Sequence, residues 1–130
     1  MDKQRRAAEV VQALAAAERL ALSVQCLTEF YSTTTLRLPD RLPPATALAQ
    51  VGRLMRIGVI LDLTPPVVLE ACRGSAAHQL SIWDALIWAS AKMNGIPYVL
   101  TEDAEHGRFL EGVTYLDPFD PRFELAPLVG

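Results

Sequence analysis

The sequence predicts an α/β fold in which a parallel sheet is covered by helices on both faces. Short apolar runs rich in Val, Ile and Leu, typical of buried strands, alternate along the chain with longer stretches of helical period. A chain of 130 residues has the size of one domain and can bury about two thirds of its unfolded surface. Apolar residues make up 51% of the chain and charged residues 21%, which argues against intrinsic disorder.

The first third of the chain predicts a helix, a strand and a second helix. Apolar side chains recur with a helical period over residues 3–19, and Asp2 can cap this helix. The apolar run at residues 20–22 predicts a strand, although periodicity alone leaves a helix open there. A helical pattern resumes at residues 24–34 and weakens at three consecutive threonines. Three prolines at residues 38–44 predict a loop.

The remaining elements continue the alternation. Residues 45–57 have a helical period, and residues 59–61 form a short β-branched strand. Thr64 precedes two prolines, which predicts a helix that begins there and ends near Gly74 or one turn later. Another helix is predicted at residues 82–94, before Gly95 and Pro97. Two further strands are predicted, at residues 98–101 and 113–116.

The charge of the chain is small and uneven. A formal net charge of −3 excludes a strongly basic nucleic-acid coat protein, but not a nuclease that binds through a metal and a few arginines. Residues 102–124 carry a net charge of −5, and residues 1–101 carry +2. Ten of the twelve basic residues are arginine, which suits planar recognition of phosphate, although a solvated surface explains them equally well.

Cysteine usage and hydropathy indicate the compartment. Cys26 and Cys72 are the only cysteines, and their spacing fits neither a zinc ribbon nor a disulfide framework. Both lie in helical apolar patterns, so we expect two core thiols in a reducing compartment, which favours a cytoplasmic protein. No apolar run approaches 18 residues and no signal-peptide pattern is present, so we expect no membrane span.

Three acidic residues are placed where a parallel sheet would gather them. Glu29 lies on the helix after the first predicted strand, Asp84 lies in the first turn of the 82–94 helix, and Asp103 follows the 98–101 strand. Carboxyl ends of parallel strands and the following helix starts share one edge of a sheet. Such carboxylates repel one another unless a hard cation such as Mg²⁺ or Mn²⁺ lies among them. The chemistry that such a site supports is phosphodiester hydrolysis.

Each acid also has an ordinary interpretation. Ser81 and Asp84 match a capping box, although a carboxylate in so apolar a helix needs a partner if it is buried. Taken alone, Glu29 fits a surface helix residue and Asp103 an ordinary loop acid. For each of the three acids, the ordinary role and a role in a shared metal site are both open.

Other chemistries have little support in the sequence. The chain contains no G-x-S-x-G, P-loop, G-x-G-x-x-G or H-E-x-x-H motif. His78 and His106 lack ligand spacing, so we interpret both as surface or loop histidines.

Three blocks of sequence resemble the PIN domain, and most closely the VapC-like toxins of type II toxin–antitoxin systems. These blocks are LSVQCLTEF at residues 22–30, LSIWDALI at residues 80–87, and LTED followed by HG at residues 100–107. The segment VTYLDPF at residues 113–119 is also similar to that subgroup. The resemblance covers about residues 3–120 of a single domain at 1–130, and leaves 121–130 as a tail.

The resemblance implies a three-layer α/β/α fold and an Mg²⁺-dependent endoribonuclease, with Mn²⁺ as a possible substitute. The metal ligands and catalytic residues that it implies are Glu29, Asp84 and Asp103. Thr101 matches a hydroxyl residue often found beside the last aspartate, and an ordinary strand threonine is the alternative. The implied partners are an RNA substrate, a cognate antitoxin and a second copy in a homodimer. The arginines that we consider for contacts with the RNA backbone are Arg5, Arg6, Arg37 and Arg41.

The chain departs from the family pattern at its start. Family members begin with a central strand that ends in an aspartate, whereas here the sequence begins at the next helix, and Asp2 follows no strand. We therefore expect two neighbouring strands without a shared partner and one metal ligand fewer. Two explanations stay open. The start codon is assigned too late, or the chain is a true N-terminal truncation that is inactive and poorly folded unless a partner strand fills the gap.

A second class of function is weighed against the nuclease. A non-catalytic PIN-like module would only bind its antitoxin partner and would show no chelator-sensitive cleavage of RNA.

Overall fold

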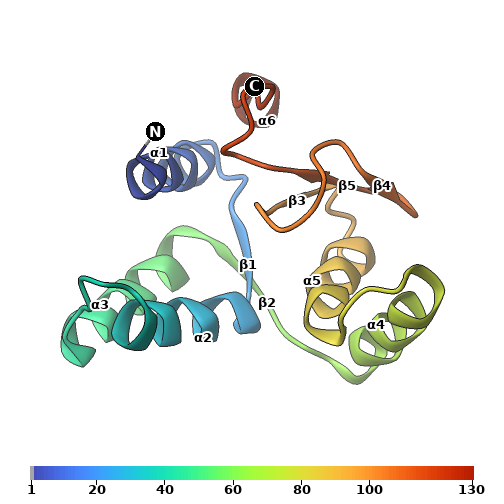
Figure 1. Ribbon diagram of the computed structural model, residues 1–130, viewed down its shortest axis with the longest axis horizontal. Helices are drawn as coiled ribbons and strands as arrows, with labels where there is room; N and C mark the ends of the chain where they lie inside the picture. The colour runs from blue at the N-terminus through green and yellow to red at the C-terminus, as the bar shows by residue number, and fades with distance from the viewer. Residues whose placement is uncertain (1) are drawn as a thin grey trace.

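The computed structural model describes residues 2–130, in which helices surround two short sheets (Figure 1). The helices are α1 (Lys3–Ala16), α2 (Val24–Ser32), α3 (Pro44–Ile57), α4 (Pro65–His78), α5 (Ile82–Met93) and α6 (Ala126–Val129), with a π-helix η1 (Thr33–Arg37) directly after α2. The strands are β1 (Ala21–Ser23), β2 (Val59–Leu61), β3 (Tyr98–Leu100), β4 (Phe109–Leu110) and β5 (Val113–Leu116).

The predicted α/β class is confirmed, but the strands form two sheets instead of one. β1 pairs with β2 in parallel, with Leu22 opposite Ile60. In the second sheet, of order β3-β5-β4, β3 pairs with β5 in parallel and β4 pairs with β5 antiparallel. Each of β1 and β3 therefore has one strand partner, and they are not paired with each other.

Side-chain caps fix the helix starts that the sequence predicts. Asp2 accepts a hydrogen bond from the N–H of Arg5 at 3.2 Å, as predicted. The Ser23, Thr64 and Ser81 side chains cap α2, α4 and α5 in the same way.

None of the helices within residues 2–130 is both long and apolar enough to cross a membrane.

The larger core lies where α4 and α5 pack on the β3-β5-β4 sheet. Trp88 is fully buried in it, and its indole N–H donates to the carbonyl of Leu110 at 3.2 Å. The buried residues of α4 are Val67, Ala71 and Gly74, at helical spacing on one face. Cys72 falls off this face and is exposed, so the prediction of a core thiol there is wrong.

A smaller core covers the other side of the molecule. Val10 and Leu14 of α1 pack with Leu20 and Phe123, so the C-terminal segment closes over the first helix. α1 and α6 are neighbours in Figure 1.

An ion-pair network joins α4, α5 and the β4–β5 turn above Trp88. Glu70 accepts from Arg73 and from Lys92, each at 2.5 Å. Glu111, in the turn, accepts from the Arg73 guanidinium at 2.7 Å and lies 2.6 Å from Nε2 of His78. His78 is the last residue of α4 and is partly exposed, so it is a surface histidine that has Glu111 as a partner.

The network lowers the pKa of both acids. Hydrogen bonds from Arg73 and then Lys92 lower the pKa of Glu70 to about 2. Hydrogen bonds from His78, Lys92 and Arg73 lower the pKa of Glu111 to about 2. Both carboxylates are harder to protonate in the folded chain than in the unfolded chain. They therefore stabilise the folded chain at pH values above the ordinary pKa of glutamate, and this contribution disappears as the pH falls toward 2.

We therefore expect acid sensitivity that depends on Glu70. The thermal midpoint of the wild type should fall between pH 5 and pH 3, and Glu70→Gln should reduce this pH-dependent fall by roughly 3 °C or more. The matched control is Glu124→Gln, since Glu124 is exposed and forms no ion pair within residues 2–130. An equal pH-dependent fall in wild type and Glu70→Gln would contradict the assignment.

Candidate functional site

Asp84 lies in the exposed first turn of α5. Its backbone N–H donates to the hydroxyl of Ser81 at 3.1 Å, which is half of the predicted capping box. Its carboxylate is exposed, so the desolvation free energy that a buried carboxylate in an apolar helix would require does not arise. Burial begins one residue later, at Ala85, because the first turn extends beyond the packed part of the helix. The neighbouring Trp83 is 64% exposed.

Glu29 lies on α2 and is connected to the start of α5 through Gln25. The Gln25 amide N–H donates to the Glu29 carboxylate at 3.3 Å and to the backbone carbonyl of Trp83 at 3.1 Å. Glu29 is exposed, and Gln25 is partly buried. One amide therefore connects the Glu29 side chain with the residue that precedes Asp84.

Asp103 lies in the loop after β3. Its N–H donates to the hydroxyl of Thr101 at 3.1 Å, which orders the loop while leaving the carboxylate exposed. The adjacent Glu102 accepts from Lys3 of α1 at 2.6 Å. The hydrogen bond that Lys3 donates to Glu102 and the charge of that carboxylate raise the pKa of Lys3, and the charges of Asp117 and Asp103 also contribute.

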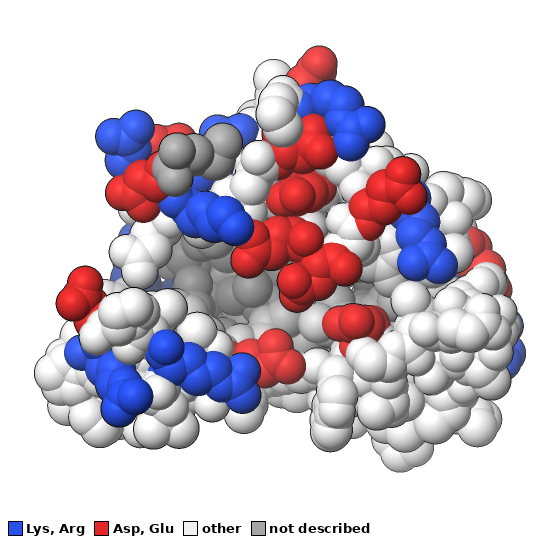
Figure 2. All heavy atoms as spheres, viewed as in Figure 1, with Lys and Arg blue, Asp and Glu red and all other residues white. Residues whose placement is uncertain are grey.

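Acidic side chains gather around the hollow in the middle of the face shown in Figure 2. Basic side chains also border this hollow, so the acidic surface lies along one edge of it. Such an arrangement attracts cations. It repels a polyanion unless a cation or bound metal intervenes.

The three predicted site residues are not brought together as one metal-binding group. Within residues 2–130, no three Asp, Glu, His or Cys side chains are arranged so that they could hold a metal ion. Glu29 and Asp84 are linked through Gln25 and Trp83, whereas Asp103 lies beside the Lys3–Glu102 pair. Their joint role as ligands stays a prediction.

Two buried polar atoms beside these acids have no partner. Oε1 of Gln25 and the hydroxyl of Tyr115 are both buried without a hydrogen bond within the described chain. Burial raises the pKa of Tyr115, while the Arg108 charge opposes this increase and the Asp84 charge adds to it. Carboxylates together with an amide oxygen are the donor types that Mg²⁺ and Mn²⁺ prefer, so the donor set fits such an ion.

The four candidate arginines fall into two groups. Arg5 and Arg6 pair with Glu9, each at 3.7 Å, and Arg6 also donates to the carbonyl of Pro118. Arg37 and Arg41 are exposed and form no ion pair within the described part of the chain. Arg37 and Arg41 are therefore the better candidates for phosphate contacts.

Sequence reasoning missed Gln25, Tyr115 and Lys3. Gln25 could have been found, since it lies four residues before Glu29 on the same helix face. Lys3 and Tyr115 could not, since only the fold brings them to Glu102 and Asp84.

Parallel strand pairs covered by helices, with exposed acids after β3 and at the start of α5, define an α/β domain with acidic residues after a strand and at a helix start. The chain belongs to the PIN domain family, whose family model matches residues 1–110. The PIN domain family is of a nuclease type and acts on nucleic acid. This supports the prediction of a nuclease-type domain. A search of curated proteins found no match.

Proposed function

We propose that this chain is a cytoplasmic, metal-dependent endoribonuclease toxin of a toxin–antitoxin pair, similar to VapC. The observation that carries the proposal is the placement of exposed acids on a PIN domain, with Gln25 joining the Glu29 side chain to the Asp84 turn.

Glu29, Asp84 and Asp103 would hold Mg²⁺ or Mn²⁺. When bound, such an ion polarises a phosphoryl oxygen and lowers the pKa of water. The unpartnered Oε1 of Gln25 is available to accept a hydrogen bond from a water molecule in the same region.

Gln25, Thr101 and Lys3 position the proposed metal ligands. The Gln25 amide restrains the Glu29 rotamer, and the Thr101 hydroxyl restrains the backbone at Asp103. Lys3 compensates the charge of Glu102, so the neighbouring Asp103 experiences less repulsion.

Single-stranded RNA is the substrate that the surroundings favour. The exposed indole of Trp83 is next to Asp84 and offers a face on which a base can stack. The free guanidinium groups of Arg37 and Arg41 can contact backbone phosphates.

A protein partner is supported by the apolar surface of η1 and α3. Leu36, Leu48 and Met55 are large apolar residues that are exposed there. We propose that a cognate antitoxin or a second copy in a homodimer covers this surface.

The test is cleavage of a labelled single-stranded RNA by the purified chain. We expect cleavage with Mg²⁺ or Mn²⁺, loss of cleavage on adding EDTA, and recovery with excess metal, because the carboxylates need a cation to approach phosphate. An Asp84→Asn preparation purified in parallel controls for contaminating ribonuclease. EDTA-insensitive cleavage would contradict the proposal.

The alternative is a non-catalytic module that binds only its antitoxin. It is favoured by the absence of a three-residue metal group within residues 2–130. Binding of the partner together with no chelator-sensitive cleavage would select this alternative.

A further inference from the structure

A glycine bulge directly precedes β4, opposite Tyr115 of β5. The N–H of Gly107 donates to the carbonyl of Tyr115 at 2.7 Å, and the N–H of Tyr115 donates to the carbonyl of Arg108 at 2.8 Å. Two residues on one side therefore face one residue on the other, and Gly107 has a φ of 89°, which defines a G1 bulge. Bulges redirect side chains and are over-represented beside active sites.

The bulge places Arg108 on the same face of the sheet as Tyr115. Phe109 pairs with Thr114, so the next pair in the register is Arg108 with Tyr115. Directly opposite residues of an antiparallel pair have their side chains on one face, with Cβ atoms about 5 Å apart. Tyr115 is buried in the core that α4 and α5 form with this sheet. Arg108 therefore lies on the α5 side of the sheet.

The start of α5 lies at the level of this pair. The turn at residues 94–97 reverses the chain between α5 and β3, β5 runs parallel to β3, and β4 runs antiparallel to β5, so α5 and β4 have the same direction. The bond from the Trp88 indole to the Leu110 carbonyl fixes their register. Asp84 lies one helical turn before Trp88, a step of about 5 Å. Arg108 lies two residues before Leu110, a step of about 7 Å, which brings it beside the start of α5.

Arg108 is available to a ligand. Its side chain is exposed and forms no ion pair in the part of the chain that the structure describes. The charges of Arg108 and Asp84 act in opposite directions on the pKa of Tyr115, which agrees with their common neighbourhood. A guanidinium is a planar fork that matches two phosphate oxygens. Beside acids that repel RNA, it supplies the attraction that phosphate needs.

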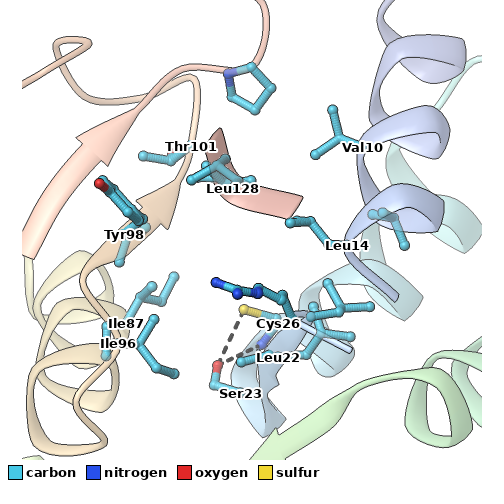
Figure 3. Close-up of a pocket in the computed structure, with 18 of the residues that line it drawn as sticks. Val10, Leu14, Leu22, Ser23, Cys26, Ile87, Ile96, Tyr98, Thr101 and Leu128 are labelled. Atoms are coloured by element: carbon cyan, nitrogen blue, oxygen red, sulfur yellow. Dashed lines mark hydrogen bonds between the residues drawn. The ribbon is translucent and has the colours of Figure 1, made fainter. Parts of the chain in front are cut away.

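The groove of about 470 Å³ between the two sheets is a separate feature (Figure 3). Ile87 and Thr101 line it, whereas Asp84, Arg108 and Tyr115 are not among the described residues of its lining. The surroundings of Arg108 therefore do not depend on what occupies that groove.

We propose that Arg108 binds a non-bridging phosphate oxygen of the RNA beside Asp84, and that the Gly107 bulge directs it there. This inference rests on the proposed ribonuclease function and adds a substrate-binding residue to it. Arg108 was not among the arginines considered from the sequence, because only the register of the hairpin places it beside α5.

The test is binding of a labelled single-stranded RNA to Asp84→Asn chains in EDTA, where no metal-dependent cleavage is expected. Adding Arg108→Gln should weaken binding by roughly threefold to tenfold. It should also reduce the slope of log affinity against log salt by about 0.7, the value for one lost phosphate contact on a single strand. Arg108→Lys keeps the charge and should keep the slope.

Arg19→Gln is the matched control for the change in charge. Arg19 is exposed and forms no ion pair within residues 2–130, and it precedes β1, at the opposite ends of the strands from Asp103. We expect Arg19→Gln to change neither the affinity nor the salt slope.

Two glycine variants test how Arg108 is directed. Gly107 and Gly112 have φ values of 89° and 91°, and an added Cβ would meet nothing within 4 Å at either, so alanine strains both positions alike. Gly107→Ala should weaken RNA binding about as much as Arg108→Gln, and should add little in the Arg108→Gln background. Gly112→Ala should lower the thermal midpoint by a similar amount but leave RNA binding unchanged.

Three results would overturn the inference. The first is unchanged affinity and salt slope in Arg108→Gln, and the second is an equal loss in Arg108→Gln and Arg19→Gln. The third is a loss of Mn²⁺ binding when Arg108→Gln is made in the wild-type chain, since that would assign Arg108 to ordering the acids. The nuclease proposal fails separately. Absence of chelator-sensitive cleavage by the wild type, with RNA binding still dependent on Arg108, would contradict the ribonuclease and support the phosphate contact.

Discussion

Replacing Gly74 with alanine is expected to destabilise the protein by about 2–4 kcal/mol, although alanine is the better helix former. A Cβ atom at Gly74 would lie 2.2 Å from Cζ3 of Trp88 and 2.8 Å from two further ring atoms. The ring is fully buried and its N–H is bonded to Leu110, so it has little freedom to move. Overpacking at a rigid contact therefore outweighs the gain of about 1 kcal/mol in helix propensity.

The measurement is the thermal midpoint, which should fall by roughly 8–15 °C. Gly52→Ala in α3 is the matched control, since its Cβ would meet only the end of the Arg56 side chain at 3.6 Å. We expect Gly52→Ala to be neutral or to stabilise by up to about 1 kcal/mol. Similar midpoints for the two variants would contradict the packing argument.

A double-mutant cycle tests the named contact directly. Trp88→Phe shortens the ring and opens space beside Gly74, so Gly74→Ala should cost less in that background, with a coupling of about 1–2 kcal/mol. Additive effects would show that Gly74→Ala acts through another contact.

The sequence predicts the regular elements of this fold well because local patterns determine them. The β-branched run at Val59–Leu61 and the run at Val113–Leu116 have the predicted bounds. The predicted helix at residues 3–19 ends earlier, at Ala16. The residue at which a helix ends depends on the local conformation of its last turn more than on the spacing of its apolar residues.

Three short elements escaped prediction, and one of them is α6, which lies in the segment 121–130 that we expected to be a tail. β4 has two residues, too few for an alternating pattern, and the turn that follows it has positive φ at both Glu111 and Gly112. A two-residue turn of this kind is typical of a β-hairpin. Gly112 is the one residue of the turn that indicates it in the sequence. The π-helix Thr33–Arg37 falls where the threonines weakened the helical pattern.

The separation into two sheets agrees with the expectation that two neighbouring strands lack a shared partner, although periodicity alone could not predict which strands pair. A pattern indicates that β1 and β3 are strands, but pairing depends on which edges meet in three dimensions. The same limit applies to the candidate site. Glu29 and Asp84 were predicted to approach through helix and sheet geometry, whereas their link through Gln25 and the Trp83 carbonyl depends on side-chain placement.

Asp84→Asn is expected to reduce metal-dependent cleavage of RNA by roughly 100-fold or more, because an amide cannot supply the negative charge that a hard cation requires. Folding should change little. The cap bond uses the backbone N–H of residue 84, which asparagine retains, and the exposed carboxylate contributes through the helix dipole only about 0.3–1 kcal/mol.

Asp40→Asn is the matched control, since Asp40 is exposed and forms no ion pair within residues 2–130. Glu29→Gln and Asp103→Asn complete the set, and binding of Mn²⁺ should weaken in all three site variants but not in the control. If only Glu29→Gln and Asp84→Asn lose metal binding, the ion is held on the Gln25 side and Asp103 is not a ligand. Full cleavage by Asp84→Asn would remove this residue from the site, whatever the other two variants do.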